Sequence, residues 1–147
     1  MTNLFDLSGR VAMVTGASRG LGQHFARVLS GAGADIIVTS RTASSLDPIE
    51  KELTALGRRV GCVALDVREK ESIERGVAEA LRHFGRVDVL VNNAGCNIRK
   101  PAMDVTWSDW NEILDTNLRG AFFVAQGIAR EMIPRQSGRI INIGSVT

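Results

Sequence analysis

The first residues that could do chemistry form a glycine-rich stretch near the N-terminus. The sequence TGASRGLG spans residues 15–22 and spaces Gly16, Gly20 and Gly22 as G-x-x-x-G-x-G. Glycine tolerates positive φ and allows a ligand to approach the backbone closely. The stretch follows an apolar run and opens a helical pattern, and the free N–H groups of a helix N-terminus attract phosphate. This context favours dinucleotide binding over an ordinary tight turn.

Ser40 and Arg41 follow the second apolar run, where a dinucleotide site often holds an acid for the ribose 2′-hydroxyl. Arg19, inside the glycine-rich stretch, is a second cation on the same side. A guanidinium matches a 2′-phosphate, whereas a carboxylate would repel it. The pattern favours NADP(H) as the cofactor, with NAD(H) as the second choice. The alternative is a pair of solvated surface arginines.

Polar residues also follow the third and fourth apolar runs. Asp66 and Val67 come after the third run, and an acid there either bonds an adenine amino group or caps a turn. The sequence NNAG occupies residues 92–95 after the fourth run. Asparagine side chains lock turns by bonding nearby backbone, so Asn92 and Asn93 have a structural explanation even within a cofactor site.

Two further polar residues lie near the C-terminal end. Asn117 falls within an apolar stripe at helical spacing, and a buried amide is costly unless it is hydrogen-bonded. It either bonds a nearby carbonyl, sits at a helix kink, or holds a water beside an active site. Ser145 follows the last apolar run, Ile140–Ile143, which is typical of a buried strand.

The elements that must position these residues alternate along the whole chain. Continuously apolar runs are typical of strands covered on both faces, and amphipathic segments between them are typical of helices. The pattern predicts an α/β fold with a doubly wound, Rossmann-type parallel sheet, and one domain over residues 1–147. In such sheets ligands bind beyond the carboxyl ends of the strands. The expected strands are Val11–Val14, Ile36–Thr39, Val60–Leu65, Val87–Val91 and Ile140–Ile143, and the expected helices are Leu21–Gly31, Ser44–Leu56, Lys70–Phe84 and Trp107–Met132.

Composition excludes several classes of protein. The net charge is only +2 with scattered basic residues, which argues against a nucleic-acid or membrane-surface partner. The N-terminus lacks the features of a signal peptide, and no apolar run is long enough to span a membrane. Cys62 and Cys96 suit a reduced, cytoplasmic compartment, and we expect no metal site. His24 and His83 are expected at the surface.

These motifs together resemble the short-chain dehydrogenase/reductase family. The matching elements are TGASRGLG (15–22), DV (66–67), NNAG (92–95), Asn117 and INIGS (141–145), in the family's order. The resemblance implies a nicotinamide-dependent oxidoreductase acting on a carbonyl or alcohol. It implies Ser145 as the catalytic serine and Asn117 as the active-site asparagine. The cofactor-binding residues that it implies are Gly16, Ser18, Arg19, Gly20, Leu21, Gly22, Ser40, Arg41, Asp66, Val67, Asn92, Ala94 and Gly95.

The chain departs from the family pattern in one catalytic feature. In the family the serine works with a downstream Tyr-x-x-x-Lys pair, in which the tyrosine is the general acid/base. The 147 residues contain no tyrosine. We therefore expect the N-terminal, cofactor-binding part of a longer enzyme, truncated after the fifth strand and inactive alone. Its last strand would keep an exposed edge, and the apolar stripe of the long helix would find few partners.

The substrate class has several candidates. The stretch NIRKPA places Arg99 and Lys100 near the site and resembles gluconate 5-dehydrogenase-like members, which act on sugar acids. A cationic loop suits a carboxylate substrate, and a solvated basic loop is the alternative. A 3-ketoacyl-thioester reductase is the rival within the family. The resemblance also implies a homo-oligomer, a dimer or tetramer packed through the long helix.

Two other classes remain open at this point. One is a non-catalytic nucleotide-binding module. The other is a methyltransferase-like domain, which Arg41 and the NNAG stretch disfavour, because an S-adenosyl cofactor carries no phosphate.

Overall fold

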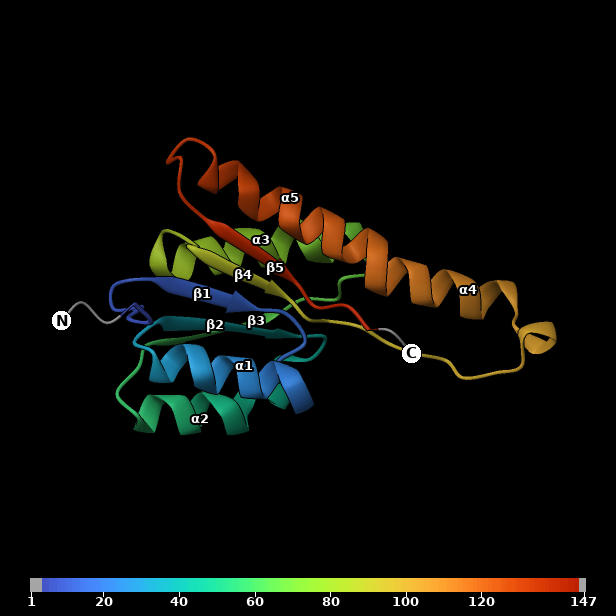
Figure 1. The fold of residues 1–147 in the computed structure, drawn as a ribbon, viewed down its shortest axis with the longest axis horizontal. Coiled ribbons are helices and arrows are strands. Elements are labelled where there is room, and N and C mark those ends of the chain that lie inside the picture. Colours follow the sequence, from blue (N-terminus) through green and yellow to red (C-terminus); the bar gives the residue numbers. More distant parts are fainter. Residues whose placement is uncertain (1–3, 146–147) are drawn as a thin grey trace.

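The computed structural model describes residues 4–145 and shows a three-layer α/β arrangement (Figure 1). Five parallel strands pair in the order β3-β2-β1-β4-β5. This confirms the predicted parallel sheet, with strand limits that differ from the predicted ones by at most two residues. The strands are β1 (Val11–Val14), β2 (Asp35–Ser40), β3 (Val60–Ala64), β4 (Val89–Asn92) and β5 (Arg139–Asn142).

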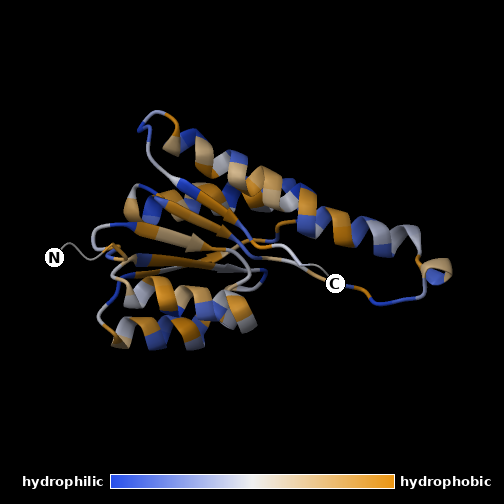
Figure 2. Cartoon of the chain, viewed as in Figure 1, coloured by the Kyte–Doolittle hydropathy of each residue, from blue (hydrophilic) through white to orange (hydrophobic). Residues whose placement is uncertain are grey.

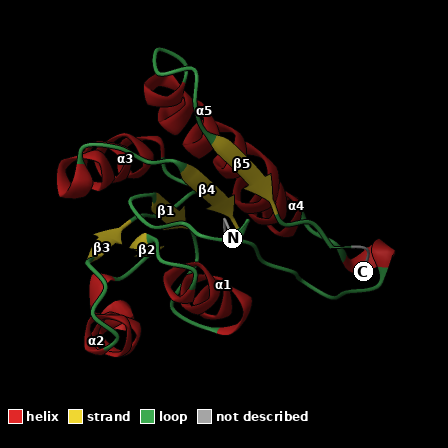
Figure 3. Cartoon of the chain, turned by 60° about the vertical axis from the view of Figure 1, so that its left-hand side comes forward, coloured by secondary structure: helices red, strands yellow, loops and turns green. Residues whose placement is uncertain are grey.

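Helices cover both faces of the sheet (Figures 1 and 3). Helices α1 (Gly20–Gly31) and α2 (Asp47–Ala55) lie on one face, and α2 is preceded by a 3₁₀ turn, η1 (Ala43–Leu46). Helices α3 (Lys70–Phe84) and α5 (Ala121–Met132) lie on the other face.

The sheet has a hydrophobic core on each face. Each central strand contributes side chains to both cores, because successive strand residues point to opposite faces. Ala12 and Val14 of β1 pack in the core beneath α1 and α2, whereas Val11 and Met13 pack in the core beneath α3 and α5. This double burial explains why the strands are continuously apolar. No helix in residues 4–145 is long and apolar enough to cross a membrane.

The predicted helix over Trp107–Met132 exists as one continuous rod with an unpredicted interruption. It begins at α4 (Trp107–Leu114), widens into a π-helical segment, η3 (Asp115–Gly120), and continues as α5. Its start is a capping box: Asp109 N–H donates to Thr106 Oγ1 at 3.1 Å, and Thr106 N–H donates to Asp109 Oδ2 at 2.9 Å. A second 3₁₀ turn, η2 (Ala102–Asp104), precedes it.

The apolar stripe predicted for this helix packs against the core only in part, at Ala125, Ile128 and Met132. The predicted stripe consists of Trp110, Ile113, Leu114, Leu118, Ala121, Phe122, Ala125, Ile128, Ala129 and Met132. The buried positions are Thr116, Gly120, Val124, Ile128 and Met132, of which the stripe contained the last two. A π turn holds an extra residue, so a stripe traced at constant helical period loses its phase there. The apolar residues of the outer face (Figure 2) are exposed, including Leu118 at 65% and Phe122 at 59%.

Strand β5 lies at the edge of the sheet and pairs only with β4 among the described residues. Its apolar side chains are exposed, Ile141 for example at 45%. The prediction of a buried strand is therefore wrong for this segment, and the expected exposed edge is confirmed. The reason is that no described element covers its free side.

Candidate functional site

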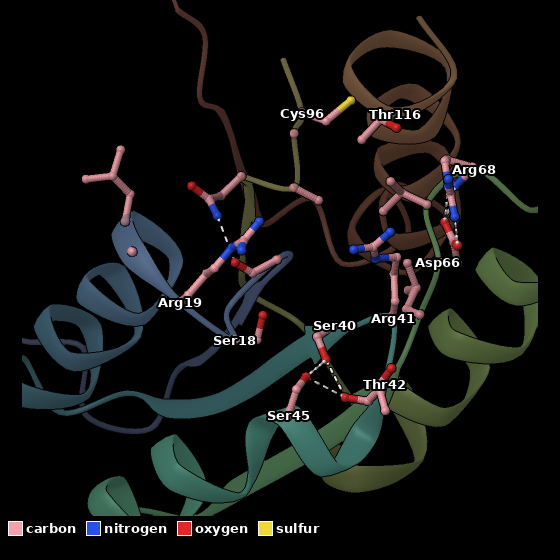
Figure 4. A pocket seen from close by; sticks show the side chains of 18 of the residues that line it. Ser18, Arg19, Ser40, Arg41, Thr42, Ser45, Asp66, Arg68, Cys96 and Thr116 are labelled. Carbon is pink, nitrogen blue, oxygen red and sulfur yellow. Dashed lines mark hydrogen bonds and ion pairs between the residues drawn. The ribbon is translucent and has the colours of Figure 1, made fainter. Parts of the chain in front are cut away.

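A cavity of about 590 Å³ opens at the carboxyl edge of the sheet, where the loops after β1 to β4 converge (Figure 4). Helix α4 and segment η3 contribute Glu112 and Thr116 to its wall. Most of the cofactor-binding residues implied by the sequence line it, whereas Gly22 and Asn92 do not. The implied residues in its lining are Gly16, Ser18, Arg19, Gly20, Leu21, Ser40, Arg41, Asp66, Val67, Ala94 and Gly95.

The glycine-rich loop is packed too tightly for side chains at two positions. Gly16 has φ +66°, and a Cβ there would lie 2.8 Å from the Cα of Ala94. A Cβ on Gly22 would lie 2.2 Å from the Gly16 carbonyl oxygen. Gly16 and Gly20 line the cavity, so the loop presents bare backbone there. Arg19 at the N-cap of α1 makes no side-chain capping bond, which leaves the first N–H groups of the helix to an anion.

Thr15 and Asn93 join this loop to the loop after β4. Thr15 Oγ1 accepts hydrogen bonds from the backbone N–H groups of Asn93 and Ala94, each at 3.0 Å. Asn93 Nδ2 donates to the carbonyl oxygens of Thr15 and Gly16, at 3.0 and 3.2 Å. Sequence reasoning did not place Thr15 in the site, although a threonine opening the glycine-rich motif was the available signal.

Asn92 has a structural environment that separates it from Asn93. Its Nδ2 donates to the Ala121 carbonyl oxygen and to Asn142 Oδ1, each at 3.0 Å. It is buried and joins β4, β5 and the start of α5. Asn93 is the first residue after β4, and of this pair only Asn93 lines the cavity.

The turn after β2 presents Arg41 to the cavity. The Ser40 hydroxyl donates to the Thr42 carbonyl oxygen at 2.6 Å and lies 2.7 Å from Ser45 Oγ, which bonds the same carbonyl. These bonds hold the turn. Within residues 4–145, Arg19 and Arg41 form no ion pair with a carboxylate, so both guanidinium charges remain available to a ligand.

Asp66 is held by Arg68, a residue that sequence reasoning missed. Arg68 Nε and backbone N–H donate to Asp66 Oδ1 at 3.0 Å, and Arg68 Nη2 donates to Oδ2 at 2.7 Å. These bonds, chiefly the side-chain ones, outweigh burial and hold the pKa of Asp66 below its ordinary value. Arg68 Nη1 also lies 3.8 Å from Glu112 Oε1 on α4. A basic residue two positions after the acid was the only signal available in the sequence.

Asn117 is exposed rather than buried, and it is hydrogen-bonded to backbone. Its Nδ2 donates to the Cys96 carbonyl oxygen, and its Oδ1 accepts from the Cys96 N–H, both at 2.8 Å. Of the alternatives left open by the sequence, bonding to a nearby carbonyl describes this arrangement. The π-helical segment carries Asn117, and Cys96 lines the cavity beside it.

Ser145 lies three residues beyond the end of β5, at the same edge of the sheet as the cavity. The Ile143 N–H donates to the Asn92 carbonyl oxygen at 2.9 Å, so the chain leaving β5 runs beside the start of the 92–95 loop. Ser145 is exposed, and neither it nor Asn117 lines the cavity.

Arg99 and Lys100 lie outside the cavity lining. Lys100 Nζ lies 2.6 Å from Asp109 Oδ2, and this bond is the main cause that lowers the pKa of Asp109 to about 2. Lys100 thus reinforces the capping box of α4. Arg99 is exposed and forms no ion pair among residues 4–145, where no group of metal-ligating side chains occurs either.

Comparison with known proteins agrees with this geometry. The short chain dehydrogenase family model matches residues 10–147. The chain is 42% identical over 144 residues to gluconate 5-dehydrogenase of Gluconobacter oxydans, covering 98% of this chain and 56% of that protein. It is 38% identical over 141 residues to the 3-oxoacyl-[acyl-carrier-protein] reductase of Escherichia coli, covering 96% of this chain and 57% of that protein.

A solved structure gives the same picture. The gluconate 5-dehydrogenase from Burkholderia cenocepacia, in complex with NADP and tartrate, superposes with a TM-score of 0.91 at 38% identity. The alignment covers 97% of this chain and 56% of that one. The chain therefore spans somewhat more than half the length of the relatives it matches. The family model covers residues 10–147, nearly the whole chain, and the chain therefore belongs to the short chain dehydrogenase family.

Proposed function

We propose that the chain is the cofactor-binding part of an NADP(H)-dependent oxidoreductase, which transfers hydride between nicotinamide and a carbonyl or alcohol. The observation that supports it most is the cavity at the carboxyl edge of the sheet. Bare glycine backbone lies at one side of it, and Arg41, which pairs with no carboxylate of residues 4–145, lies at the other. A dinucleotide with a 2′-phosphate matches that combination.

The residues present fit this cofactor. The loop at residues 16–22 and the N-terminus of α1 would hold the pyrophosphate, and Arg41 with Arg19 would hold the 2′-phosphate. Asp66 and Val67 would border the adenine, and Ala94 and Gly95 the nicotinamide ribose. The NADP complex of the Burkholderia cenocepacia relative supports the choice of NADP(H).

The bound nicotinamide would supply or accept the hydride. In the proposed reaction Ser145 donates a hydrogen bond to the substrate oxygen as negative charge develops there. Asn117 keeps the backbone at Cys96 in place beside the cavity. In the proposed reaction its second Nδ2 hydrogen and second Oδ1 lone pair bind a water that relays the proton. The family's mechanism uses a tyrosine as the proton donor, and these 147 residues contain none. We accordingly propose that this chain alone binds NADP(H) without reducing carbonyls.

The substrate class that we propose is a sugar acid such as gluconate. Similarity to two gluconate 5-dehydrogenases supports it, one of them solved with the dicarboxylate tartrate. Arg99, exposed and without an ion pair among residues 4–145, is a candidate for the substrate carboxylate, whereas the charge of Lys100 is already engaged by Asp109. The second candidate is a 3-ketoacyl thioester, supported by the similarity to the Escherichia coli reductase.

We further propose that the protein is a cytoplasmic homo-oligomer, a dimer or tetramer. The exposed apolar face of the long helix formed by α4, η3 and α5 supports this association, and it includes Trp110, Leu114, Leu118 and Phe122. Light scattering coupled to size-exclusion chromatography tests it, and Leu118→Lys should shift the mass toward the monomer. A monomeric wild-type chain contradicts the oligomer proposal for this chain.

Titration with NADPH and NADH tests the cofactor. Arg41→Asp should weaken NADPH binding by on the order of 2–3 kcal/mol, through a lost ion pair and added repulsion, and should affect NADH little. Equal losses for both cofactors would show that Arg41 does not contact the 2′-phosphate. A turnover assay with a panel of ketones and keto acids completes the test. Turnover by the pure chain would contradict the need for an external proton donor.

A further inference from the structure

Three guanidinium groups line the cavity, and they differ in what they bond. Arg19 and Arg41 form no ion pair with a described carboxylate, whereas Arg68 is bound in a fork to Asp66. Figure 4 shows Arg41, Asp66 and Arg68 together on one wall. The charge of Arg41 contributes to the lowered pKa of Asp66, so the two groups are within electrostatic reach.

Asp66 is therefore a potential partner for Arg41 that Arg68 has already engaged. Arg68 supplies three bonds, of 2.7 to 3.0 Å, and both carboxylate oxygens receive at least one. A fork of this kind fixes the orientation of the carboxylate and offsets its charge. The charge of Arg41 is therefore not offset by an ion pair with Asp66.

We propose that Arg68 is a specificity-determining residue for the 2′-phosphate, which acts through Asp66 rather than by touching the phosphate. By holding both oxygens of Asp66, Arg68 prevents that carboxylate from pairing with Arg41 and from repelling a phosphate. This inference rests on the proposed NADP(H) function and names a residue that controls it. Arg68 is accordingly a positioning residue.

A purely structural role for Arg68 would change ligand binding in a different way. Loss of a bond that merely shapes the adenosine end would weaken all adenine ligands alike, with or without a 2′-phosphate. Loss of the proposed role weakens only ligands that carry the phosphate. The ratio of the two dissociation constants therefore separates the roles.

The experiment measures binding of adenosine 2′,5′-bisphosphate and of AMP to the 147-residue chain by calorimetry, and of NADPH and NADH by fluorescence. Arg68→Gln should lower the preference for the 2′-phosphate by about tenfold, since the freed Asp66 competes for Arg41, a change equal to about 1.4 kcal/mol. The double variant Arg68→Gln/Asp66→Asn should recover the preference to within about twofold. The loss of Arg68 also leaves Glu112 without its ion pair. Recovery of the preference in the double variant would show that Asp66, and not Glu112, causes the effect.

Arg27→Gln is the matched control. Arg27 also forms a two-bond fork with a carboxylate, that of Glu52, at 2.6 and 2.8 Å, but lies outside the cavity. Its loss should leave the preference unchanged. Circular dichroism checks that each variant is folded. Should Arg68→Gln not fold, Arg68→Lys keeps the charge but loses the fork and should lower the preference by a smaller factor.

The outcomes distinguish the two proposals. A wild-type chain with no preference for the 2′-phosphate contradicts the proposed NADP(H) function. A wild-type preference that Arg68→Gln leaves intact, or that the added Asp66→Asn does not recover, overturns the role of Arg68 and leaves the cofactor proposal standing.

Discussion

Thr15 and Asn93 hold the two central loops of the cavity together through reciprocal hydrogen bonds. The threonine hydroxyl accepts the Asn93 N–H at 3.0 Å, and the asparagine amide donates to the Thr15 carbonyl oxygen at 3.0 Å. These residues are 78 positions apart in the sequence. The bonds connect the ends of adjacent strands, so the shape of the candidate cofactor site depends on them.

Thr15→Val tests this connection. The substitution preserves the shape of the side chain but removes the acceptor of two N–H groups, those of Asn93 and Ala94. We expect the free energy of unfolding in urea to fall by about 1–3 kcal/mol, and NADPH binding to weaken. Thr54→Val, on the exposed face of α2, is the control and should change neither. Equal effects of the two variants would mean that the bonds of Thr15 contribute nothing specific.

Two glycines of the same helix, α1, give a matched pair of opposite predictions. Gly22→Ala places a Cβ 2.2 Å from the Gly16 carbonyl oxygen, so the loop must shift; stability should fall by about 1–3 kcal/mol, and dinucleotide binding should be lost. Gly31→Ala meets nothing within 4 Å and should raise stability by about 0.4–1 kcal/mol by restricting the unfolded chain. Chemical denaturation and NADPH titration check both. A tolerated Gly22→Ala would show that the close approach is not required.

The two cysteines should react at very different rates with a thiol reagent at pH 8. Burial raises the pKa of the Cys62 thiol to about 12, so almost none of it is thiolate at that pH. Cys96 lines the cavity and should react first, and bound NADPH should slow it. Ser replacement at each position assigns the two phases. A fast phase that persists in Cys96→Ser would contradict this assignment.

Asn117→Ala should speed the labelling of Cys96 several-fold. The amide bonds both the N–H and the carbonyl of Cys96 at 2.8 Å, and its loss releases the loop after β4 from the long helix. Asn111→Ala is the control, because Asn111 is an exposed asparagine on α4. An unchanged rate for Asn117→Ala would mean that other contacts hold the loop.

Asp88 should make the free energy of unfolding depend on pH. It is 4% exposed and accepts bonds from the Val11 N–H at 2.9 Å and from Arg135 Nη1 at 3.1 Å. Burial alone would raise the pKa of Asp88, but these bonds and those from Arg86 outweigh it and set the pKa below its ordinary value. A carboxyl whose folded-state pKa is depressed stabilises the fold fully above its unfolded-state pKa, about 3.9, and loses that contribution as the pH falls through the folded-state value.

Asp88→Asn should therefore lower the free energy of unfolding by about 2 kcal/mol at pH 7, with a difference that shrinks below about pH 4. Urea denaturation between pH 7 and pH 2.5 measures it. Glu52→Gln removes the exposed pair with Arg27 and serves as the control, with little change expected at any pH. A difference between wild type and Asp88→Asn that stays constant over this range would contradict the proposed ionisation.

Local patterns in the sequence determined the fold class and the location of the site. Apolar runs and amphipathic helical segments alternate along the sequence, and this alternation predicts the parallel sheet. A parallel sheet brings the carboxyl ends of its strands to one edge, which locates the site. Gly16, Arg41 and Asp66 each follow a strand, which is why all three were predicted at the cavity they line. The capping box at Thr106 likewise involves residues only three positions apart.

Only the tertiary structure decided how these residues are used. Asn117 is exposed, and the buried face of the long helix departs from the predicted one, where a π turn interrupts the helix. The different roles of Asn92 and Asn93, and the bonds of Asn117, depend on contacts between residues 21 to 78 positions apart. Asp66 and Arg68 are close in sequence, yet Arg41 comes near them only because β2 and β3 are adjacent strands, and our proposal for Arg68 depends on that adjacency. Periodicity reports which face of an element is apolar, whereas hydrogen-bond partners are set by which elements meet in space.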